Sequence, residues 1–337
     1  MPIRAVIKTA RLTLRPPMPD DASAFAAALA DWEVARWLSA PPWPYGLDDA
    51  RDFLTGVATA NHWVIECQGE VAGLIGIKPD LGYWLNRHAW GKGFASEAAC
   101  AVLAAHFADP AADIVRSGHF DGNTRSRHVL GKRGFRPDGF RITRCRATGD
   151  TSVLLHSMAL TRAEWLAANP LLIETERLVL RPLDPEKDAG PLARIGGDES
   201  VAPMLMSVPR PWPEADARDW ILRAPWRGYP GFRLGIFLKG GPLIGATGLG
   251  PSAPMTTMYF IDPAHWDQGY ATEAMQGFLD WTTRHFAPEA IEADHFTDNP
   301  ASARVLSKLG FTETGTGLGT SAARPGPAPV RIWRRTF

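Results

Sequence analysis

Two short stretches of the chain place glycine and polar residues in the same order before an expected helix. The first, HAWGKGFASEA, runs from His88 to Ala98, and the second, HWDQGYATEA, runs from His265 to Ala274. A strand, a glycine-containing loop and a helix N-terminus together form an anion site, because backbone N–H groups and the helix dipole favour negative charge there. The spacing matches neither a Walker loop nor a dinucleotide-binding fingerprint.

The two stretches differ in charge at the centre of the loop. Gly91 of the first is replaced by Asp267 in the second, and Lys92 is replaced by Gln268. A carboxylate in the loop repels a bound anion, whereas a lysine attracts it. We therefore expect the first loop to be the better anion site.

The loops belong to an internal repeat that covers nearly the whole chain. From the loops onward, corresponding residues are separated by 176 positions, as in the pairs Trp90 and Trp266, Gly93 and Gly269, Glu97 and Glu273, and Asn123 and Asn299. This period is far longer than a solenoid repeat, so it indicates a duplicated domain. We predict an N-terminal domain over residues 1–160, a linker over 161–172 and a C-terminal domain over 173–337.

Each half is expected to contain the same succession of strands and helices. A strand opens each half, and later strands alternate with helices that start near Ser96 or Thr272. Glu97 and Glu273 suit the first turn of those helices and are interpreted as structural. The other expected elements are short helices at Ser126–Lys132 and Ser302–Lys308, C-caps at Gly134 and Gly310, and a mobile loop at Gly315–Pro329.

The composition favours an ordinary intracellular globular protein. The 337 residues are 45% hydrophobic and 21% charged, with a formal net charge of zero, so neither nucleic acid nor a membrane is expected as a partner. Cys67, Cys100 and Cys145 show neither metal-ligand spacing nor a disulfide framework. We expect a cytoplasmic protein without a bound metal.

The motifs of both halves resemble the GNAT N-acetyltransferase superfamily, in particular the branch that includes ribosomal-protein N-terminal acetyltransferases. The residues that carry the resemblance are RLTLRP, GYWLNRHAWGKGFASEA and NTRSRHVLGKRGF in the first half, and RLVLRP, MYFIDPAHWDQGYATEA and NPASARVLSKLGF in the second. The resemblance implies two tandem α/β (α+β) folds. Each would have a mixed, mostly antiparallel central sheet, helices on both faces and one splayed pair of strands.

The resemblance also implies acetyl-CoA as the cofactor, with the loop holding its pyrophosphate. The strand before the loop, with Tyr83, Trp84 and Leu85, would flank the acetyl group and offer a backbone N–H to the thioester oxygen. Asn123 would bind the cofactor arm, and Asn299 and Gly269 are the equivalents in the second half. The loop residues implied are His88, Trp90, Gly91, Lys92, Gly93, Phe94 and Ala95.

Two sets of residues are candidates for proton transfer. Ser126, with Ser302 in the second half, would protonate the departing thiolate, although a plain helix cap is an equally good interpretation of either serine. The amine acceptor needs a base, because only its neutral form attacks. A strand histidine also commonly satisfies only a local hydrogen bond. Candidate bases are His119, Asp121 and Asp80 in the first half and Asp294, His295 and Asp298 in the second.

We therefore expect an acetyl-CoA-dependent N-acetyltransferase in which a primary amine, of a protein N-terminus, a peptide or a small molecule, attacks the thioester directly. The N-terminal half would bind acetyl-CoA, and the C-terminal half would be a degenerate copy. The alternative is a catalytically silent acyl-CoA-binding or scaffold protein. The chain would be a monomer in which the two domains form a pseudo-dimer, or a homodimer.

Overall fold

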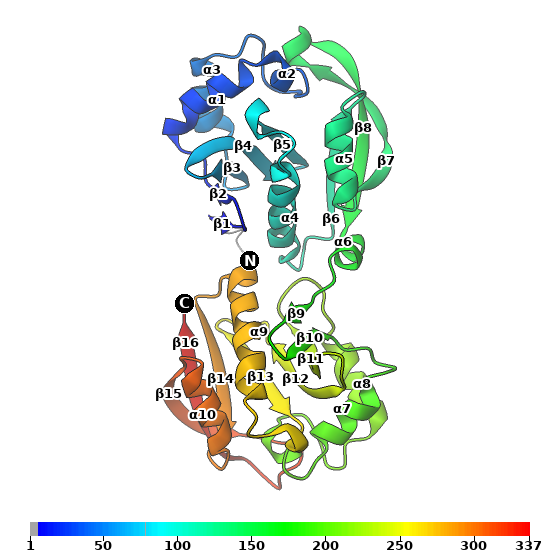
Figure 1. Cartoon of the computed structure of the whole chain (residues 1–337), viewed down its shortest axis with the longest axis vertical. Coiled ribbons are helices and arrows are strands. Elements are labelled where there is room, and N and C mark those ends of the chain that lie inside the picture. The colour runs from blue at the N-terminus through cyan, green and yellow to red at the C-terminus, as the bar shows by residue number, and fades with distance from the viewer. Residues whose placement is uncertain (1–5, 78) are drawn as a thin grey trace. The chain divides into compact units, whose positions relative to one another are not determined.

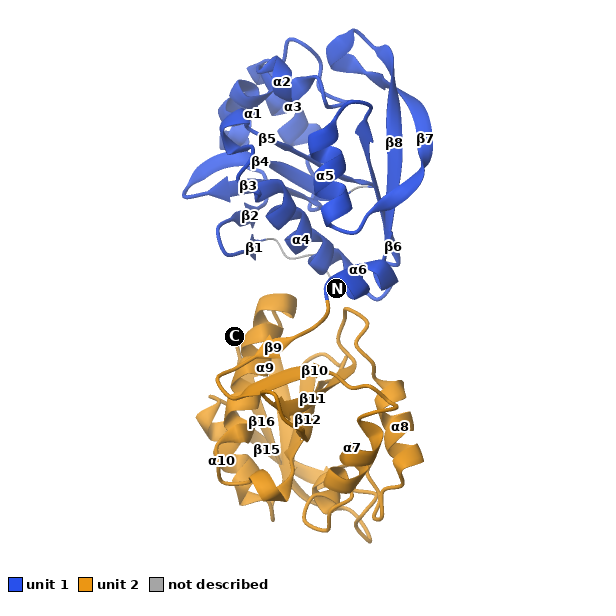
Figure 2. Cartoon of the chain, turned by 45° about the vertical axis from the view of Figure 1, so that its right-hand side comes forward, with its two compact units in different colours: residues 1–169 blue, residues 170–337 orange. Residues whose placement is uncertain are grey.

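The computed structural model describes residues 6–77 and 79–337. The chain divides into two compact units, residues 1–169 and residues 170–337 (Figure 2). The division falls within the range 161–172, which the sequence suggested as a linker. Much of that range is helical, because it contains α6 (Arg162–Ala168). Trp165 of this helix is buried in the core of the first unit.

Two sheets form among the described residues of the first unit (Figure 1). One sheet is wholly antiparallel, in the order β1 (Ile7–Lys8), β2 (Thr13–Arg15), β3 (His62–Cys67), β4 (Glu70–Ile77) and β5 (Leu81–Leu85). The other has the order β6 (Ile114–Phe120), β8 (Thr151–Thr161) and β7 (Arg136–Cys145), and it is also antiparallel.

The strands of the second unit form one eight-stranded sheet. Its order is β15 (Thr312–Gly319), β16 (Ala328–Thr336), β14 (Ala290–Phe296), β13 (Met255–Ile261), β12 (Leu243–Leu249), β11 (Phe232–Leu238), β10 (Leu178–Pro182) and β9 (Ile173–Glu174). Strands β13 and β14 are parallel, whereas the other neighbouring strands are antiparallel. The mixed, mostly antiparallel sheet expected from the sequence is confirmed.

Helices cover both faces of the sheet, as predicted. In the first unit, Trp63 and Ile65 of β3 belong to the same core cluster as α4 (Phe94–Phe107), whereas Val64 between them packs in the cluster of α1 (Ala22–Leu29). This alternation follows from successive strand side chains pointing to opposite faces. The remaining α-helices are α2 (Trp32–Ala35), α3 (Leu47–Asp52), α5 (Thr124–Lys132), α7 (Ala189–Gly196), α8 (Glu214–Arg223), α9 (Tyr270–Phe286) and α10 (Pro300–Lys308).

Short helical turns occupy several of the connections between these elements. Five are 3-10 turns and one, η2, is a π-helical turn. They are η1 (Pro19–Asp21), η2 (Phe53–Val57), η3 (Arg87–Ala89), η4 (Arg146–Thr148), η5 (Ala202–Met204) and η6 (Pro263–His265).

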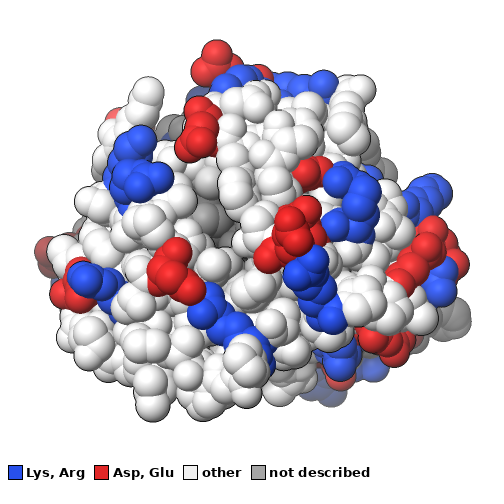
Figure 3. All heavy atoms as spheres, turned by 90° about the horizontal axis from the view of Figure 1, so that it is seen from below, with Lys and Arg blue, Asp and Glu red and all other residues white. Residues whose placement is uncertain are grey.

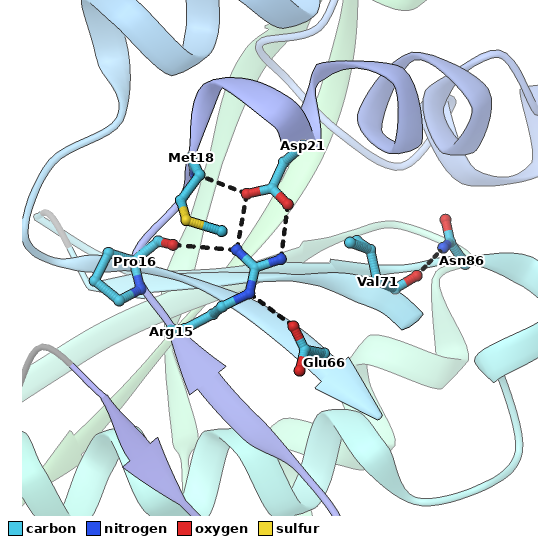
Figure 4. Close-up of polar contacts among 7 residues, drawn as sticks. All are labelled: Arg15, Pro16, Met18, Asp21, Glu66, Val71 and Asn86. Atoms are coloured by element: carbon cyan, nitrogen blue, oxygen red, sulfur yellow. Dashed lines mark hydrogen bonds and ion pairs between the residues drawn. The ribbon is translucent and has the colours of Figure 1, made fainter. Parts of the chain in front are cut away.

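An ion-pair network of the buried Asp21 and the half-buried Arg15 and Glu66 ties β2, β3 and η1 together in the first unit (Figure 4). Arg15 donates from Nη1 and Nη2 to the Asp21 carboxylate at 2.9 and 2.8 Å, and from Nε to Glu66 at 2.7 Å. The hydrogen bonds with Asp21 raise the pKa of Arg15 further above its ordinary value. In the second unit Arg181 pairs with Asp188 and stacks on Phe237, with 3.8 Å between guanidinium carbon and ring centroid.

The loop predicted over Gly315–Pro329 is confined to residues 320–327, because Gly315–Gly319 lie in β15 and Ala328–Pro329 lie in β16. Residues up to Gly319 form β15, and the turn that follows is held by Arg324. Arg324 donates to the Pro203 carbonyl at 2.7 Å and to Asp298 at 2.9 Å, and its guanidinium lies over the ring of Phe296. The glycine and proline content of the segment favoured a mobile loop, and the sequence did not show that Arg324 would anchor it.

Charged side chains of both signs are interspersed among uncharged ones on the face drawn in Figure 3. The helices within the described residues include no segment that is both long and apolar enough to cross a membrane.

Candidate active site

Each unit places a loop with left-handed backbone directly before a long helix. In the first unit Gly91 and Gly93 have φ angles of +75° and +80°, and in the second Asp267 and Gly269 have φ angles of +57° and +80°. The two loops therefore have the same backbone turn, although an aspartate occupies one of the positions in the second. Aspartate is one of the few residues besides glycine that adopt this conformation readily.

The helices begin two residues earlier than the sequence predicted. Helix α4 starts at Phe94 and α9 at Tyr270, rather than near Ser96 and Thr272, because the left-handed glycines themselves are the N-cap residues. A glycine offers no side chain, and no side-chain hydrogen bond caps either helix. The first N–H groups of α4 and α9 are thus left for another acceptor, which fits an anionic ligand such as a pyrophosphate.

The loop of the first unit is anchored to the end of the preceding strand by Trp90. Its Nε1 donates to the Leu85 carbonyl at 2.9 Å, and the guanidinium of Arg125 lies over its ring. Trp266 makes the same hydrogen bond to Ile261 at 2.8 Å. His88, Lys92 and Asp267 are exposed, whereas Phe94 and Ala95 are buried at the start of α4.

The strands that flank the site separate from each other, as the resemblance implied. In the first unit β5 and β6 lie in different sheets, and Ser117 bridges them where its Oγ donates to the Leu81 carbonyl at 2.7 Å. In the second unit β13 and β14 pair only at Met255–Thr256 with Ile291–Glu292. In both units, therefore, the two strands are not hydrogen-bonded to each other at the end beside the loop, which leaves a gap in the strand pairing.

A tyrosine and a serine meet across this region in both units. Tyr83 Oη lies 3.0 Å from Ser126 Oγ, and Tyr259 Oη lies 2.8 Å from Ser302 Oγ. Burial raises the pKa of Tyr83 and of Tyr259 to about 12 in each case, against a smaller lowering by the serine. Both phenols are therefore protonated at neutral pH and can act as hydrogen-bond donors.

The two serines are not the caps of their helices. Asn123 is the N-cap of α5, with its Oδ1 accepting from Ser126 N at 3.1 Å, and Asn299 caps α10 in the same way through Ser302 N. Helices α5 and α10 therefore begin at Thr124 and Pro300, two residues before the predicted starts. The serine hydroxyls are free of a capping role and face the tyrosines instead.

The predicted acetyl-flanking residues lie on both faces of β5. Tyr83 and Leu85 pack against the core cluster that contains α4. Trp84 points to the opposite face and makes an edge contact with Phe25 of α1, with ring centroids 5.2 Å apart. The three side chains therefore do not lie on one face of β5, and they cannot all line the same side of an acetyl group.

The candidate bases of the first unit form a cluster with a residue that the sequence analysis missed. His119 stacks on His156, with ring centroids 5.0 Å apart, and His156 Nε2 lies 3.0 Å from Asp121 Oδ1. His119 Nδ1 lies 3.1 Å from the Phe120 carbonyl. A carbonyl only accepts, so Nδ1 of His119 carries the proton and Nε2 has the lone pair of a base.

The candidate bases of the second unit lie in different surroundings. His295 is buried and makes the same Nδ1 contact, at 2.8 Å to the Phe296 carbonyl. Asp294, the neighbouring residue on β14, is exposed. Asp298 is paired with Arg324, whose hydrogen bond lowers the pKa of Asp298 and makes it a weaker base. In the first unit Asp80 lies 3.8 Å from Arg141.

The comparisons with known proteins agree with this geometry. The family model of the acetyltransferase (GNAT) domain matches residues 11–136 and again residues 177–312. The chain therefore belongs to the GNAT acetyltransferase family, with one such domain in each unit. It is an acetyltransferase that uses acetyl-CoA, and the duplication predicted from the sequence is confirmed.

Several individual proteins are similar to one such domain. The chain is 28% identical over 149 residues to YoaA of Bacillus subtilis (strain 168), an uncharacterised N-acetyltransferase, covering 43% of this chain and 84% of YoaA. It is 29% identical over 147 residues to the N-acetyltransferase p20 of Bacillus licheniformis, covering 39% and 82%. Mycobacterium smegmatis RimJ, solved with a CoA-disulfide, aligns with a TM-score of 0.44 at 21% identity, covering 50% and 88%.

Proposed function

We propose that the protein transfers the acetyl group of acetyl-CoA to a primary amine, of a protein or peptide N-terminus or of a small molecule, by direct attack of the amine on the thioester. The observation that carries this proposal is the uncapped N-terminus of α4 beside the gap between β5 and β6, with Tyr83 and Ser126 on the same side. These would provide the parts that the reaction needs: an anion site, an unpaired stretch between two strands for an extended arm, and proton donors.

The loop from His88 to Ala95 would hold the pyrophosphate through its backbone N–H groups. Gly91 and Gly93 give those groups their direction, and Lys92 adds a positive charge next to them. Backbone N–H groups of β5, at Tyr83 to Leu85, would accept the charge that develops on the thioester oxygen. The side chain of Asn123 is already engaged as a helix cap, so its contribution to the cofactor arm would come through its remaining amide donor.

Ser126 and Tyr83 would supply the proton to the leaving thiolate. Ser126 Oγ would give its proton to the sulfur while Tyr83 Oη gives its own proton to Ser126, which moves the negative charge to the phenolate of Tyr83. The phenolate would regain a proton from solvent after the CoA thiol leaves. Their separation of 3.0 Å is suitable for this transfer. The pair Tyr259 and Ser302 repeats the arrangement.

The amine must lose a proton before or during attack, since its neutral form is the nucleophile. In the first unit we assign this role to His119, with its Nε2 lone pair, supported by His156 and Asp121. In the second unit the corresponding candidate is Asp294, which is exposed on β14. We further propose that the first unit is the working acetyl-CoA site, because the carboxylate of Asp267 lies in the second loop.

The test is release of the CoA thiol from acetyl-CoA in the presence of a panel of amines, including N-terminal peptides, polyamines and aminoglycosides. Turnover with at least one amine class, reduced in His119→Ala, is the expected result. Binding of acetyl-CoA without turnover on any amine would favour a silent acyl-CoA-binding protein instead.

A further inference from the structure

We propose that Arg11 and Glu97 in the first unit, and Arg177 and Glu273 in the second, are positioning residues that fix the peptide groups of the anion-binding loop. This inference rests on the proposed role of that loop in holding the pyrophosphate of acetyl-CoA. It extends the interpretation of the two glutamates as residues that only complement the helix dipole.

Arg11 connects the loop to the helix that follows it. Its Nη1 donates to the Lys92 carbonyl at 2.9 Å, in the middle of the loop, and its Nε donates to Glu97 Oε2 at 2.7 Å. The other oxygen of Glu97 accepts from Arg11 N at 3.0 Å and from Thr9 Oγ1 at 2.6 Å. The Arg11 side chain thus holds the loop, and the Glu97 carboxylate, in the first turn of α4, holds the Arg11 side chain in place.

The second unit repeats every one of these contacts. Arg177 donates to the Gln268 carbonyl at 3.0 Å and to Glu273 Oε2 at 2.6 Å, and Thr175 Oγ1 donates to Glu273 at 2.6 Å. The loop residue has changed from lysine to glutamine, but the contact is made to its carbonyl and is unaffected. The arrangement has therefore been retained where the side chains around it have diverged.

The contact with the carbonyl determines which way the peptide points. The C=O and N–H of one trans peptide unit point in opposite directions, so a carbonyl of Lys92 held by Arg11 directs the Gly93 N–H away from Arg11. A flipped peptide would instead present the carbonyl oxygen to a bound anion and repel it. A donor that is already oriented needs no reorganisation when the anion binds.

The Arg11 side chain is 50% exposed, but its ion pair with Glu97 indicates that it acts through the loop rather than as a free cation. Glu97 neutralises its guanidinium at 2.6–2.7 Å, and the carboxylate is 18% exposed. Burial opposes ionisation of Glu97, but the hydrogen bonds from Thr9 and Arg11 outweigh it and lower the pKa of the carboxyl. The pair is therefore ionised at neutral pH and has little net charge to offer to a ligand.

The experiment compares Arg11→Ala, Arg11→Lys and Glu97→Gln in the full chain. Binding of acetyl-CoA is measured by calorimetry, and the KM and kcat are measured with acetyl-CoA and with S-acetylpantetheine, which lacks the pyrophosphate. We expect Arg11→Ala and Glu97→Gln to weaken acetyl-CoA binding roughly tenfold, as for loss of a charged hydrogen bond, with kcat nearly unchanged. S-acetylpantetheine should be used equally well by all variants, and Arg11→Lys should restore only part of the affinity.

Arg116→Ala is the matched control, because Arg116 forms an exposed ion pair with Asp138 in the same unit. It should leave both substrates unaffected. If Arg11→Ala does not fold, Glu97→Gln, which keeps the shape of the side chain, answers the same question. An unchanged affinity for acetyl-CoA in the variants, or an equal loss with S-acetylpantetheine, would overturn the proposal. Failure of the unmutated protein to bind acetyl-CoA would instead count against the proposed function.

Discussion

At the scale of single residues, Gly91 and Asp267 occupy equivalent positions with the same left-handed backbone turn but a different charge. A Cβ built at Gly91 would have no heavy atom within 4 Å, and Asp267 adopts a left-handed φ of +57° at the same place. Gly91→Asp should therefore fold, at a small cost in backbone strain, but weaken acetyl-CoA binding about tenfold, through repulsion between like charges near the protein surface. Calorimetric titration of the full chain measures this.

Asp267→Gly is the reciprocal variant and should strengthen binding in the second unit. If Gly91→Asp left the affinity unchanged, the loop would not be the site of the pyrophosphate. A large fall in thermal stability in the same variant would show instead that the position is constrained by folding.

Tyr83→Phe tests the proposed proton relay. The phenyl ring keeps the packing but removes the hydroxyl that lies 3.0 Å from Ser126. We expect kcat to fall about a hundredfold, the size of a typical general acid contribution, with a smaller change in KM. Tyr45→Phe is the control, since Tyr45 is also a buried tyrosine with a pKa of about 12 but lies outside the site.

The raised pKa values of Tyr83 and Tyr259 also predict how stability varies at alkaline pH. An unfolded tyrosine loses its proton near pH 10, whereas each folded one retains it until about pH 12. Between these values the folded state binds more protons, so the free energy of unfolding falls as pH rises. Urea denaturation at pH 9 and pH 11 measures the decrease, and Tyr83→Phe should reduce it; an identical slope in that variant would contradict the assignment.

At the scale of elements, the Arg15 network holds β2 and β3 against η1. Asp21 is 4% exposed and receives two bonds from Arg15 and one from Met18 N. Asp21→Ala leaves the half-buried Arg15 guanidinium with Glu66 as its remaining acidic partner, which should cost about 2 kcal/mol, less than the loss of a partner from a fully buried pair. Urea denaturation should show the loss in the first unit.

The control for this variant is Asp48→Ala, because Asp48 forms an exposed pair with Arg51 within α3. Exposed pairs of this kind contribute about 0.3–0.5 kcal/mol. Equal effects of the two substitutions would contradict the structural importance of the Arg15 network.

The elements also show where sequence reasoning reached its limit. The order of strands and helices followed from hydrophobic alternation and from the repeat itself, but the starts of α4 and α5 were placed two residues late. In both cases the helix was expected to open at a serine, whereas Gly93 and Asn123 cap the helices two or more residues earlier. Ser, Asn and Gly are all common cap residues, so local composition did not decide among them.

Contacts between distant segments were likewise beyond the sequence. His156 joins His119 because their Cα positions are paired across β6 and β8, and that register is not encoded locally. Arg11 reaches Lys92 across 81 positions of the chain. The repeat did indicate that Arg11 and Glu97 matter, because Arg177 and Glu273 occupy the corresponding positions in the second half. The repeat does not show, however, which residue each of them contacts.

At the scale of the whole molecule, the two units have separate cores, and acetyl-CoA should distinguish them. A ligand present at a hundred times its Kd stabilises the unit that binds it by about 2.7 kcal/mol. We expect acetyl-CoA to raise the Tm of the first unit while the second unit changes little. Differential scanning calorimetry, with Gly91→Asp and Asp267→Gly to assign the transitions, measures this. Equal shifts in both units would show that the second unit also binds the cofactor well.

The anchoring of the loops by Arg11 and Arg177 has a consequence for how such a duplicated protein evolves. The loop is held through the Gln268 carbonyl and through the following helix, so its anchoring does not use the side chain at position 267. A change of glycine to aspartate there is tolerated by selection for a stable protein, even if it diminishes ligand affinity. One copy of the gene segment can therefore drift away from its original chemistry while the domain that it encodes persists as a folded, inheritable module, available for a different task.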